Sequence, residues 1–351
     1  MKAIISRFSL CALLLSTLSG CVSSILATMA VKAPNQQNVP RAVRDPVYAA
    51  RFDAVAVQTW RLPVGPPAAL LAVAVIEPGG YRTRYSIETM QGANGNKWRE
   101  PKYEWTLPPK PWAGQPRGTI LLLHGYADAR ENMMHWALCL AEFGYRCVLV
   151  DLRGHGRSTG DSIGYGAFET RDLSQLLDDL QKRNLISGRV GVLGVSYGAS
   201  VGLLLAARDP RVGPVVALEP FSAASAALVE FAHGVAPAQT AKISHATFTT
   251  AVAKANARGK FSWSDGDVLS AMPKLTAPVL FFHGEKDRWL SPDNSRRLAA
   301  VAPVGSKLTL LKDDDHLSLS MRLTPIFAEV RAWFVRYLDP VASGRELNPP
   351  S

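Results

Sequence analysis

Gly194-Val195-Ser196-Tyr197-Gly198 is the stretch that decides the fold. The apolar run 189–193 before it favours a β-strand, and the run 201–207 after it favours an α-helix. A serine at such a strand-to-helix turn takes a strained backbone conformation, and small residues two positions away on either side let strand and helix pack around it. The pattern therefore predicts a nucleophile elbow that raises the hydroxyl of Ser196 above the edge of a sheet.

A serine hydroxyl needs a general base, and the base needs an acid that orients it. Two later loops supply these groups: Asp287 and His316 each follow a strand-like run, 277–284 and 307–311. A parallel sheet brings the carboxyl ends of its strands to one edge, where ligands bind. We therefore predict that Ser196 is the nucleophile, His316 the base and Asp287 the acid.

Other residues could take the role of the acid or the base. Glu219 follows the preceding strand-like run and is the alternative acid. The three aspartates at 313–315 precede His316 directly, and a carboxylate so near in sequence seldom reaches the far imidazole nitrogen. The other histidines are weaker candidates for the base, since they fall in a strand, a helix-like run, a glycine-rich loop or an inserted segment: His283, His135, His155, His233 and His245.

Two backbone N–H groups are candidates for an oxyanion hole. Tyr197 begins the helix after the elbow, so its N–H lies at the positive end of the helix dipole. The apolar run 118–123 predicts another strand, which ends in His124-Gly125-Tyr126. We expect the N–H of Tyr126 to be the second donor.

Five segments carry a family resemblance. In chain order they are LLLHGY, VLVDLRGHGRSTGD, VGVLGVSYGAS, VLFFHGEKD and DDDHLSLS, and over roughly residues 116–340 they resemble the α/β-hydrolase superfamily. The segment 151–158 and the insertion after the sixth strand are most similar to the serine aminopeptidase-like and monoacylglycerol lipase-like branch. The resemblance implies a serine hydrolase that works through an acyl-enzyme without a cofactor. It leaves the substrate open, since this scaffold hosts esterases, lipases, amidases and peptidases.

The order of the runs predicts an α/β fold. Strand-like and helix-like runs alternate from 119 to 218, which favours a mostly parallel, doubly wound sheet. Strand-like runs at 52–60, 70–76 and 81–89 would be leading antiparallel strands. Residues 221–275 interrupt the alternation, and we expect them to form a helical cap that walls an apolar acyl pocket.

Residues 1–20 resemble a bacterial lipoprotein signal peptide. Lys2 and Arg7 form a basic region, and residues 8–18 an apolar run too short to span a bilayer comfortably. The following Leu18-Ser19-Gly20-Cys21 resembles a lipobox. We expect Cys21 to become the first mature residue and to carry acyl chains that bind the protein to a membrane.

The expected lipid anchor implies a domain organisation. Residues 21–50 are polar and contain proline, which favours a tether, and residues 51–351 would form the hydrolase domain. Val22 after the cysteine, in place of aspartate, resembles the sorting pattern of the outer membrane. The alternative is cleavage after Ala30, which would release a soluble exported enzyme.

The composition limits the partners. Removal of residues 1–20 takes away two basic residues and no acidic one, which lowers the net charge from +10 to +8. We see no arginine stripe interleaved with aromatic residues, so we expect no nucleic-acid partner. After processing, Cys139 and Cys147 remain as a disulfide or as two thiols. No metal-binding motif occurs in the sequence, and we expect no required metal.

These patterns predict an envelope-anchored serine hydrolase that cleaves carboxylic esters of small or medium acyl groups. An aminopeptidase or amidase is one alternative, and a non-catalytic lipoprotein that retains the fold is the other. A peptidase would need a carboxylate that captures the substrate amine. The cap offers three acidic residues for that role: Glu230, Asp265 and Asp267.

Overall fold

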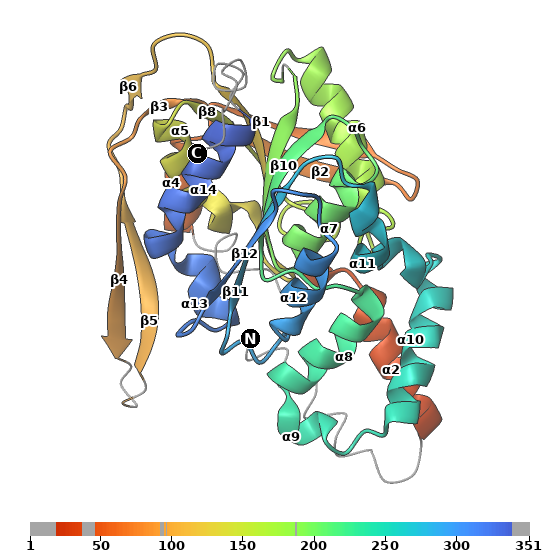
Figure 1. The fold of residues 1–351 in the computed structure, drawn as a ribbon. Coiled ribbons are helices and arrows are strands. Elements are labelled where there is room, and N and C mark those ends of the chain that lie inside the picture. Colours follow the sequence, from red (N-terminus) through yellow and green to blue (C-terminus); the bar gives the residue numbers. More distant parts are fainter. Residues whose placement is uncertain (1–18, 37–45, 92–94, 96, 187, 339–351) are drawn as a thin grey trace.

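The computed structural model of the chain describes residues 19–36, 46–91, 95, 97–186 and 188–338. Its central sheet has eight strands: β1 Gln58–Val64, β2 Ala69–Ile76, β7 Gly118–Leu123, β8 Tyr145–Val150, β9 Val190–Val195, β10 Val212–Leu218, β11 Val279–Gly284 and β12 Lys307–Leu311. They lie in the order β1-β2-β8-β7-β9-β10-β11-β12 (Figure 1). The pairs β1–β2 and β2–β8 are antiparallel, and all other neighbours are parallel. The predicted fold class is therefore confirmed.

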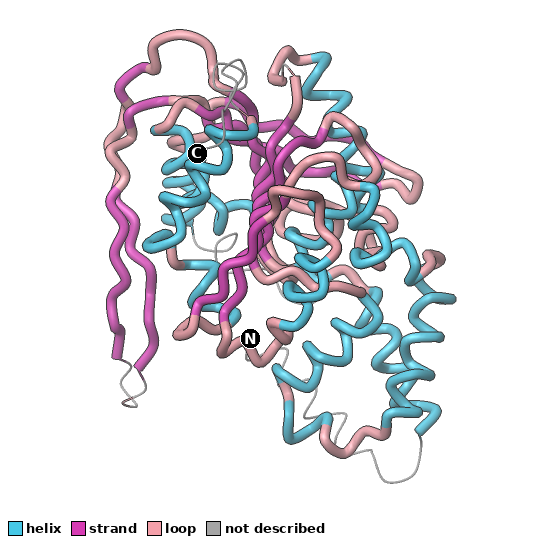
Figure 2. The backbone as a smooth tube through the Cα atoms, viewed as in Figure 1, coloured by secondary structure: helices cyan, strands magenta, loops and turns pink. Residues whose placement is uncertain are grey.

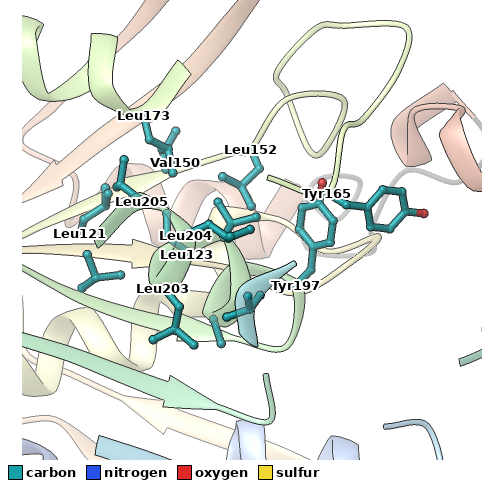
Figure 3. Packing of buried hydrophobic residues seen from close by; sticks show 14 of the residues in the cluster. Leu121, Leu123, Val150, Leu152, Tyr165, Leu173, Tyr197, Leu203, Leu204 and Leu205 are labelled. Atoms are coloured by element: carbon teal, nitrogen blue, oxygen red, sulfur yellow. The ribbon is translucent and has the colours of Figure 1, made fainter. Parts of the chain in front are cut away.

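Helices cover both faces of this sheet (Figure 2). On β7, Leu121 and Leu123 pack in one apolar core with α6 and α7, as Figure 3 shows, whereas Ile120 and Leu122 pack in a second core with α5 and α14. Since successive side chains of a strand point to opposite faces, burial on both sides requires the uninterrupted apolar runs of this sequence. The helices around the sheet are α4 Pro46–Asp53, η2 Arg130–Met133, α5 Met134–Glu142, α6 Glu169–Lys182, α7 Tyr197–Ala206, α12 Asp293–Ala300, α13 His316–Met321 and α14 Leu323–Tyr337.

Two of the predicted leading strands differ from the structure. The run 81–89 does not join the main sheet, because β4 Arg84–Gln91 pairs with β5 Lys97–Glu104 in a separate hairpin (Figure 1). Alternation of polar and apolar residues identifies a strand and leaves its partner open. The run 52–60 also begins too early, since Phe52 lies in α4. A further short pair joins β3 Gly79–Gly80 to β6 Lys110–Pro111.

The segment 221–275, expected as a cap, is helical and follows β10. It contains α8 Ala224–Val235, α9 Pro237–Thr240, α10 His245–Gly259, η3 Trp263–Gly266, α11 Val268–Ala271 and η4 Met272–Lys274. Ala232 of α8 and Phe248 of α10 belong to a small apolar cluster of their own. Ala227 of α8 and Ala255 of α10 belong to the first core of the sheet, so this group of helices is joined to that core and has a small cluster of its own besides.

Part of the expected tether is folded. Helix α2, Ser19–Val31, lies alongside α10 (Figure 1), and its Val22 and Leu26 complete the small apolar cluster. Lys254 of α10 donates to Ser23 Oγ and Ser24 Oγ at 2.9 Å each. After α2 and the 3-10 turn η1 Pro34–Gln36, the chain leaves the described residues at 37. The first part of the expected spacer is thus helical, and its apolar residues pack against the segment 221–275.

The structure also describes the cysteines and the apolar helices. Cys139 and Cys147 are free thiols, and Cys147 is buried with its Sγ 3.4 Å from the carbonyl oxygen of Ala137. Within the described ranges, none of the helices has the length and apolar character needed to cross a bilayer. Lys2, Arg7 and the apolar run 8–18 lie outside the described residues.

Candidate active site

Ser196 stands at a sharp turn between β9 and α7. Its φ of 50° and ψ of −109° lie in a region that residues other than glycine rarely adopt. A Cβ at Gly194 would lie 2.5 Å from the carbonyl oxygen of Gly198, and one at Gly198 would lie 2.4 Å from that of Leu123. Side chains at these two positions would therefore push the strand, the turn and the helix apart. The structure has the elbow geometry that the sequence predicts.

The structure brings Ser196, His316 and Asp287 together. Nε2 of His316 lies 3.0 Å from Oγ of Ser196, and Nδ1 lies 2.6 Å from Oδ2 of Asp287. The carboxylate can only accept, so Nδ1 carries the proton and Nε2 is left to accept from the serine hydroxyl. Ser196 and His316 are 9% and 8% exposed. The three side chains thus form a continuous hydrogen-bonded line in which every member is almost completely buried.

Asp287 is held by more than His316. Its Oδ1 accepts the N–H groups of Trp289 at 2.8 Å and Leu290 at 2.9 Å, and His283 Nε2 lies 3.1 Å from Oδ2. Burial alone would raise the pKa of Asp287, but the hydrogen bonds from His283 and His316 outweigh it and lower that pKa well below its usual range. The carboxylate is therefore ionised at neutral pH and fixed in orientation.

His283 is a site residue that the sequence interpretation missed. The sequence places it inside a strand, which favoured a packed histidine, and in the structure it is fully buried. Its Nε2 lies 3.1 Å from both Asp287 Oδ2 and the carbonyl oxygen of Leu290, and its Nδ1 lies 2.8 Å from Ser295 Oγ. The available signal in the sequence was the position of His283, four residues before Asp287 and near the end of the strand that leads to it.

Glu219, the alternative acid, lies beside the line as well. Its Oε2 is 3.7 Å from Nδ1 of His316, which is 1.1 Å farther than the oxygen of Asp287. Burial and the charge of Asp287 raise the pKa of Glu219 well above its usual range. Among the described residues, Glu219, Asp287 and His316 also form a group whose donor atoms lie within 4.8 Å of one another. Two of these possible metal ligands, His316 and Asp287, are already joined by the short hydrogen bond.

The candidate oxyanion donors lie on either side of the serine. Tyr197 is the first residue of α7, where backbone N–H groups have no partner within the helix. Tyr126 follows β7, and its ring centroid lies 6.3 Å from that of Tyr197. His124 shapes the loop of Tyr126, since its Nδ1 lies 2.8 Å from the Gly125 carbonyl oxygen and its Nε2 accepts the N–H of Leu152 at 3.0 Å. Burial lowers the pKa of His124 to about 4, so its ring is neutral.

A row of aromatic rings runs from Tyr126 to His316. Phe231 of α8 lies 5.8 Å from the ring of Tyr126 and 5.7 Å from that of Trp289. The ring of Trp289 in turn lies 5.1 Å from that of His316. Tyr126, Phe231 and Trp289 are half-buried. We call these three residues the aromatic rim; it links the helical segment to the loops that carry the base and the acid.

The loop 151–158 is structural. Arg153 donates to both carboxylate oxygens of Asp172, at 2.8 and 2.9 Å, and both side chains are buried. Asp151 accepts the N–H of Arg130 at 2.8 Å and that of Arg157 at 2.9 Å. These contacts bind the loop to α6 and to η2.

The chain is similar in sequence to known hydrolases. The family model described as serine aminopeptidase, S33, matches residues 114–268. The uncharacterized protein YqkD of Bacillus subtilis is 26% identical over 200 residues, which cover 56% of this chain and 64% of YqkD, just under two thirds of that relative. A monoacylglycerol lipase of Mycolicibacterium smegmatis is 29% identical over 260 residues, or 64% of this chain and 90% of the lipase.

Solved structures give the same fold. A 2,6-dihydroxy-pseudo-oxynicotine hydrolase superposes with a TM-score of 0.59 at 17% identity, covering 87% of this chain and 73% of its own. The Pyrococcus furiosus esterase Pf2001 gives 0.57 at 18% identity, covering 82% of this chain and 95% of its own. At these identities the likeness concerns the fold alone. The sheet order and these structures together show that the chain has the α/β-hydrolase fold.

Proposed function

We propose that this protein hydrolyses carboxylic esters through an acyl-enzyme on Ser196. The observation that carries the proposal is the continuous line from Ser196 Oγ through His316 to Asp287, at 3.0 and 2.6 Å. His316 Nε2 takes the hydroxyl proton as Oγ attacks the ester carbonyl, and Asp287 stabilises the imidazolium. The N–H groups of Tyr126 and Tyr197 hold the developing oxyanion.

The second half of the reaction reuses the same groups. His316 gives its proton to the leaving alcohol as the tetrahedral intermediate collapses to the acyl-enzyme. A water molecule then attacks the acyl carbonyl, with His316 again as the base, and Oγ leaves with the proton. No step in this scheme needs a cofactor.

The cap acids favour an ester over a peptide. Glu230 accepts from Ser291 N at 3.1 Å and Asn294 Nδ2 at 2.9 Å. Asp265 forms a capping box with Ser262, and Asp267 accepts from the backbone and hydroxyl of Ser270. All three carboxylates therefore stabilise local structure. An aminopeptidase would need one of them to bind a substrate amine, so we rank this activity second.

The aromatic rim supports an apolar acyl group. Phe231, Trp289 and Tyr126 form a row of rings that ends next to His316, and such ring surface is favourable for alkyl chains. The monoacylglycerol lipase named above supports the same substrate class. We propose that the helical segment 221–275 acts as a cap that selects the acyl chain and takes no part in the chemistry.

We also propose that Cys21 anchors the enzyme in the bacterial envelope. Cys21 is exposed in the first turns of α2. Cleavage after Ala30 would remove Val22 and Leu26 from the apolar cluster that they share with α8 and α10. Processing before Cys21 keeps this helix, which supports the lipoprotein alternative over the soluble one.

The test is a panel of p-nitrophenyl esters and aminoacyl anilides on residues 22–351. We expect turnover of esters, and a loss of about a thousandfold or more for Ser196→Ala together with the loss of labelling by a fluorophosphonate. Ser264→Ala, on the exposed side of the cap, is the control and keeps both signals. Stoichiometric labelling of Ser196→Ala, or faster cleavage of anilides than of esters, would overturn the proposal.

A further inference from the structure

Glu219 is a buried carboxyl group without an explained role. It follows β10 at the carboxyl edge of the sheet, with a φ of 54° and no exposed surface. Its backbone N–H donates to the carbonyl oxygen of Phe282 at 2.8 Å, which fixes it next to β11, the strand that leads to Asp287. Neither carboxyl oxygen has a hydrogen-bonding partner in the described part of the chain. A buried polar group of this kind is costly, so it calls for an explanation.

The groups that face Glu219 are mostly acidic. Asp287 lies in the loop after β11, and Asp314 and Asp315 lie in the loop after β12; all three disfavour its ionised form, and the backbone N–H of Gly284 favours it. Burial is the largest cause of the raised pKa of Glu219, and like the three aspartates it favours the neutral form. Glu219 is therefore a neutral carboxylic acid next to the ionised Asp287.

Two carboxyl groups thus lie next to one imidazole N–H, and one of them accepts its hydrogen bond. Nδ1 of His316 donates to Asp287 Oδ2 at 2.6 Å, and Oε2 of Glu219 lies 3.7 Å from the same nitrogen. Two buried carboxylates this close to each other do not both ionise, because like charges repel strongly at low dielectric. The pair therefore carries one negative charge, and Asp287 holds it because it also accepts two backbone N–H groups and His283.

We propose that Glu219 is a positioning residue for His316 that takes over orientation of the imidazole when the carboxylate of Asp287 is removed. Without that carboxylate, burial still favours the neutral form of Glu219, but the repulsion from Asp287 is gone and the Nδ1–H of His316 has lost its acceptor. Glu219 then releases its proton to solvent and accepts the Nδ1–H of His316, after a movement of about 1 Å to hydrogen-bonding distance. The inference rests on the proposed function, since it concerns the base of that reaction.

Four chains test this: the wild type, Glu219→Gln, Asp287→Ala, and the double variant. Glu219→Gln replaces a neutral acid by a neutral amide of the same shape, so we expect kcat/KM within about threefold of the wild type. Asp287→Ala is expected to keep a residual activity that depends on Glu219. Addition of Glu219→Gln to it should lower that activity by a further tenfold or more, as expected for loss of a charged hydrogen bond.

The pH profile separates positioning from a structural role. Between pH 5 and 9, kcat/KM of Asp287→Ala should show an inflection from Glu219 that the double variant lacks. Asp287→Asn, which keeps the acceptor for Trp289 and Leu290, repeats the comparison if Asp287→Ala unfolds. Asp313→Asn removes an exposed carboxylate that pairs with Lys286 in the same region, so combining it with Asp287→Ala should leave the profile unchanged.

Two results would overturn the inference. One is equal activity and an equal pH profile for Asp287→Ala and the double variant. The other is an inactive but folded Glu219→Gln single variant, which would make Glu219 essential in the presence of Asp287. Failure of the proposed function looks different, since the wild type would then hydrolyse no ester or Ser196→Ala would stay active.

Discussion

His283 lies with its Nε2 3.1 Å from Oδ2 of Asp287, the same oxygen that lies 2.6 Å from Nδ1 of His316. Because Nε2 faces two acceptors, the Asp287 carboxylate and the Leu290 carbonyl, it carries the proton, and Nδ1 accepts from Ser295. One carboxylate oxygen thus receives two imidazole N–H groups. His283 thus holds the carboxylate of Asp287 in place, and Asp287 in turn holds the imidazole of His316.

His283→Gln is expected to lower kcat about 10- to 100-fold, because Asp287 loses a hydrogen bond to a charged group. The amide of glutamine is too flexible to restore the geometry of the buried ring. The measurement is kcat on p-nitrophenyl acetate, with circular dichroism as the check of the fold. His245→Gln, on the exposed start of α10, is the matched control and should keep the wild-type rate. A kcat for His283→Gln within twofold of the wild type would show that the backbone N–H groups suffice to hold Asp287.

Phe231→Ala is expected to change the preference among acyl chains more than the rate on an acetyl ester. Its ring is part of the aromatic rim, and loss of that surface removes favourable contacts with longer alkyl chains. We expect kcat/KM on the octanoate to fall about tenfold relative to the acetate, which corresponds to the burial of one or two methylene groups.

Phe248→Ala is the matched control, because it removes the same ring from the inner cluster of the helical segment. It should lower the free energy of unfolding by about 3 kcal/mol and leave the ratio of octanoate to acetate hydrolysis unchanged. Equal losses on every ester for Phe231→Ala would assign Phe231 to stability and not to specificity.

The local parts of the site were predictable from the sequence. The elbow depends on a serine and two glycines within five residues, and Asp287 and His316 each follow a strand whose apolar run is unmistakable. Parallel strands place such positions at one edge, so sequence order was enough to bring the three together. His283 was not predictable as a site residue, because its role depends on where the loop 285–290 folds back, which the strand pattern does not encode.

Partners of isolated elements were less predictable. The strand at 84–91 has the alternation of a half-buried strand, and no local feature showed that its partner would be the strand at 97–104. Apolar residues of α2 are equally suited to an export signal and to a packed helix. The packed helix is identified by its contact with Phe248 and Ala251 of α10. Those residues lie more than 200 positions away in the chain.

Leu26→Ala is expected to destabilise the protein, whereas Ile25→Ala on the same helix is not. Leu26 is 9% exposed within the cluster of α2, α8 and α10, and Ile25 is 39% exposed. We expect a loss of about 2 to 3 kcal/mol for Leu26→Ala and less than about 0.5 kcal/mol for Ile25→Ala. Urea unfolding of residues 22–351 measures both. Equal values for the two variants would mean that α2 contributes no packing to the helical segment.

His135 is expected to make the protein less stable in acid. Burial lowers its pKa to about 4, against about 6.5 in the unfolded chain. Between these two pH values His135 binds a proton in the unfolded chain but not in the folded chain. The resulting loss of unfolding free energy is therefore absent above pH 6.5 and grows as the pH falls toward 4. From pH 7.5 to pH 5.0 the wild type should lose about 2 kcal/mol more unfolding free energy than His135→Gln, measured by urea titration. Parallel pH dependence of the two chains would contradict this, since all other titrating groups are shared.

Cys21 is expected to be the first residue of the mature chain and to carry the lipid. Processing at this position removes only Ser19 and Gly20 from α2, leaves Val22 and Leu26 in place, and puts the acyl chains at the exposed start of a helix packed on the helical segment. Two or more acyl chains give stable membrane attachment, whereas one does not. Cys21→Ser should therefore shift the protein from the membrane to the soluble fraction of a bacterial host, or leave it unprocessed, while residues 22–351 keep full ester hydrolysis. Mass spectrometry of the mature N-terminus decides between the alternatives, because an unmodified chain that begins at Val31 would exclude the anchor and would also lack most of α2.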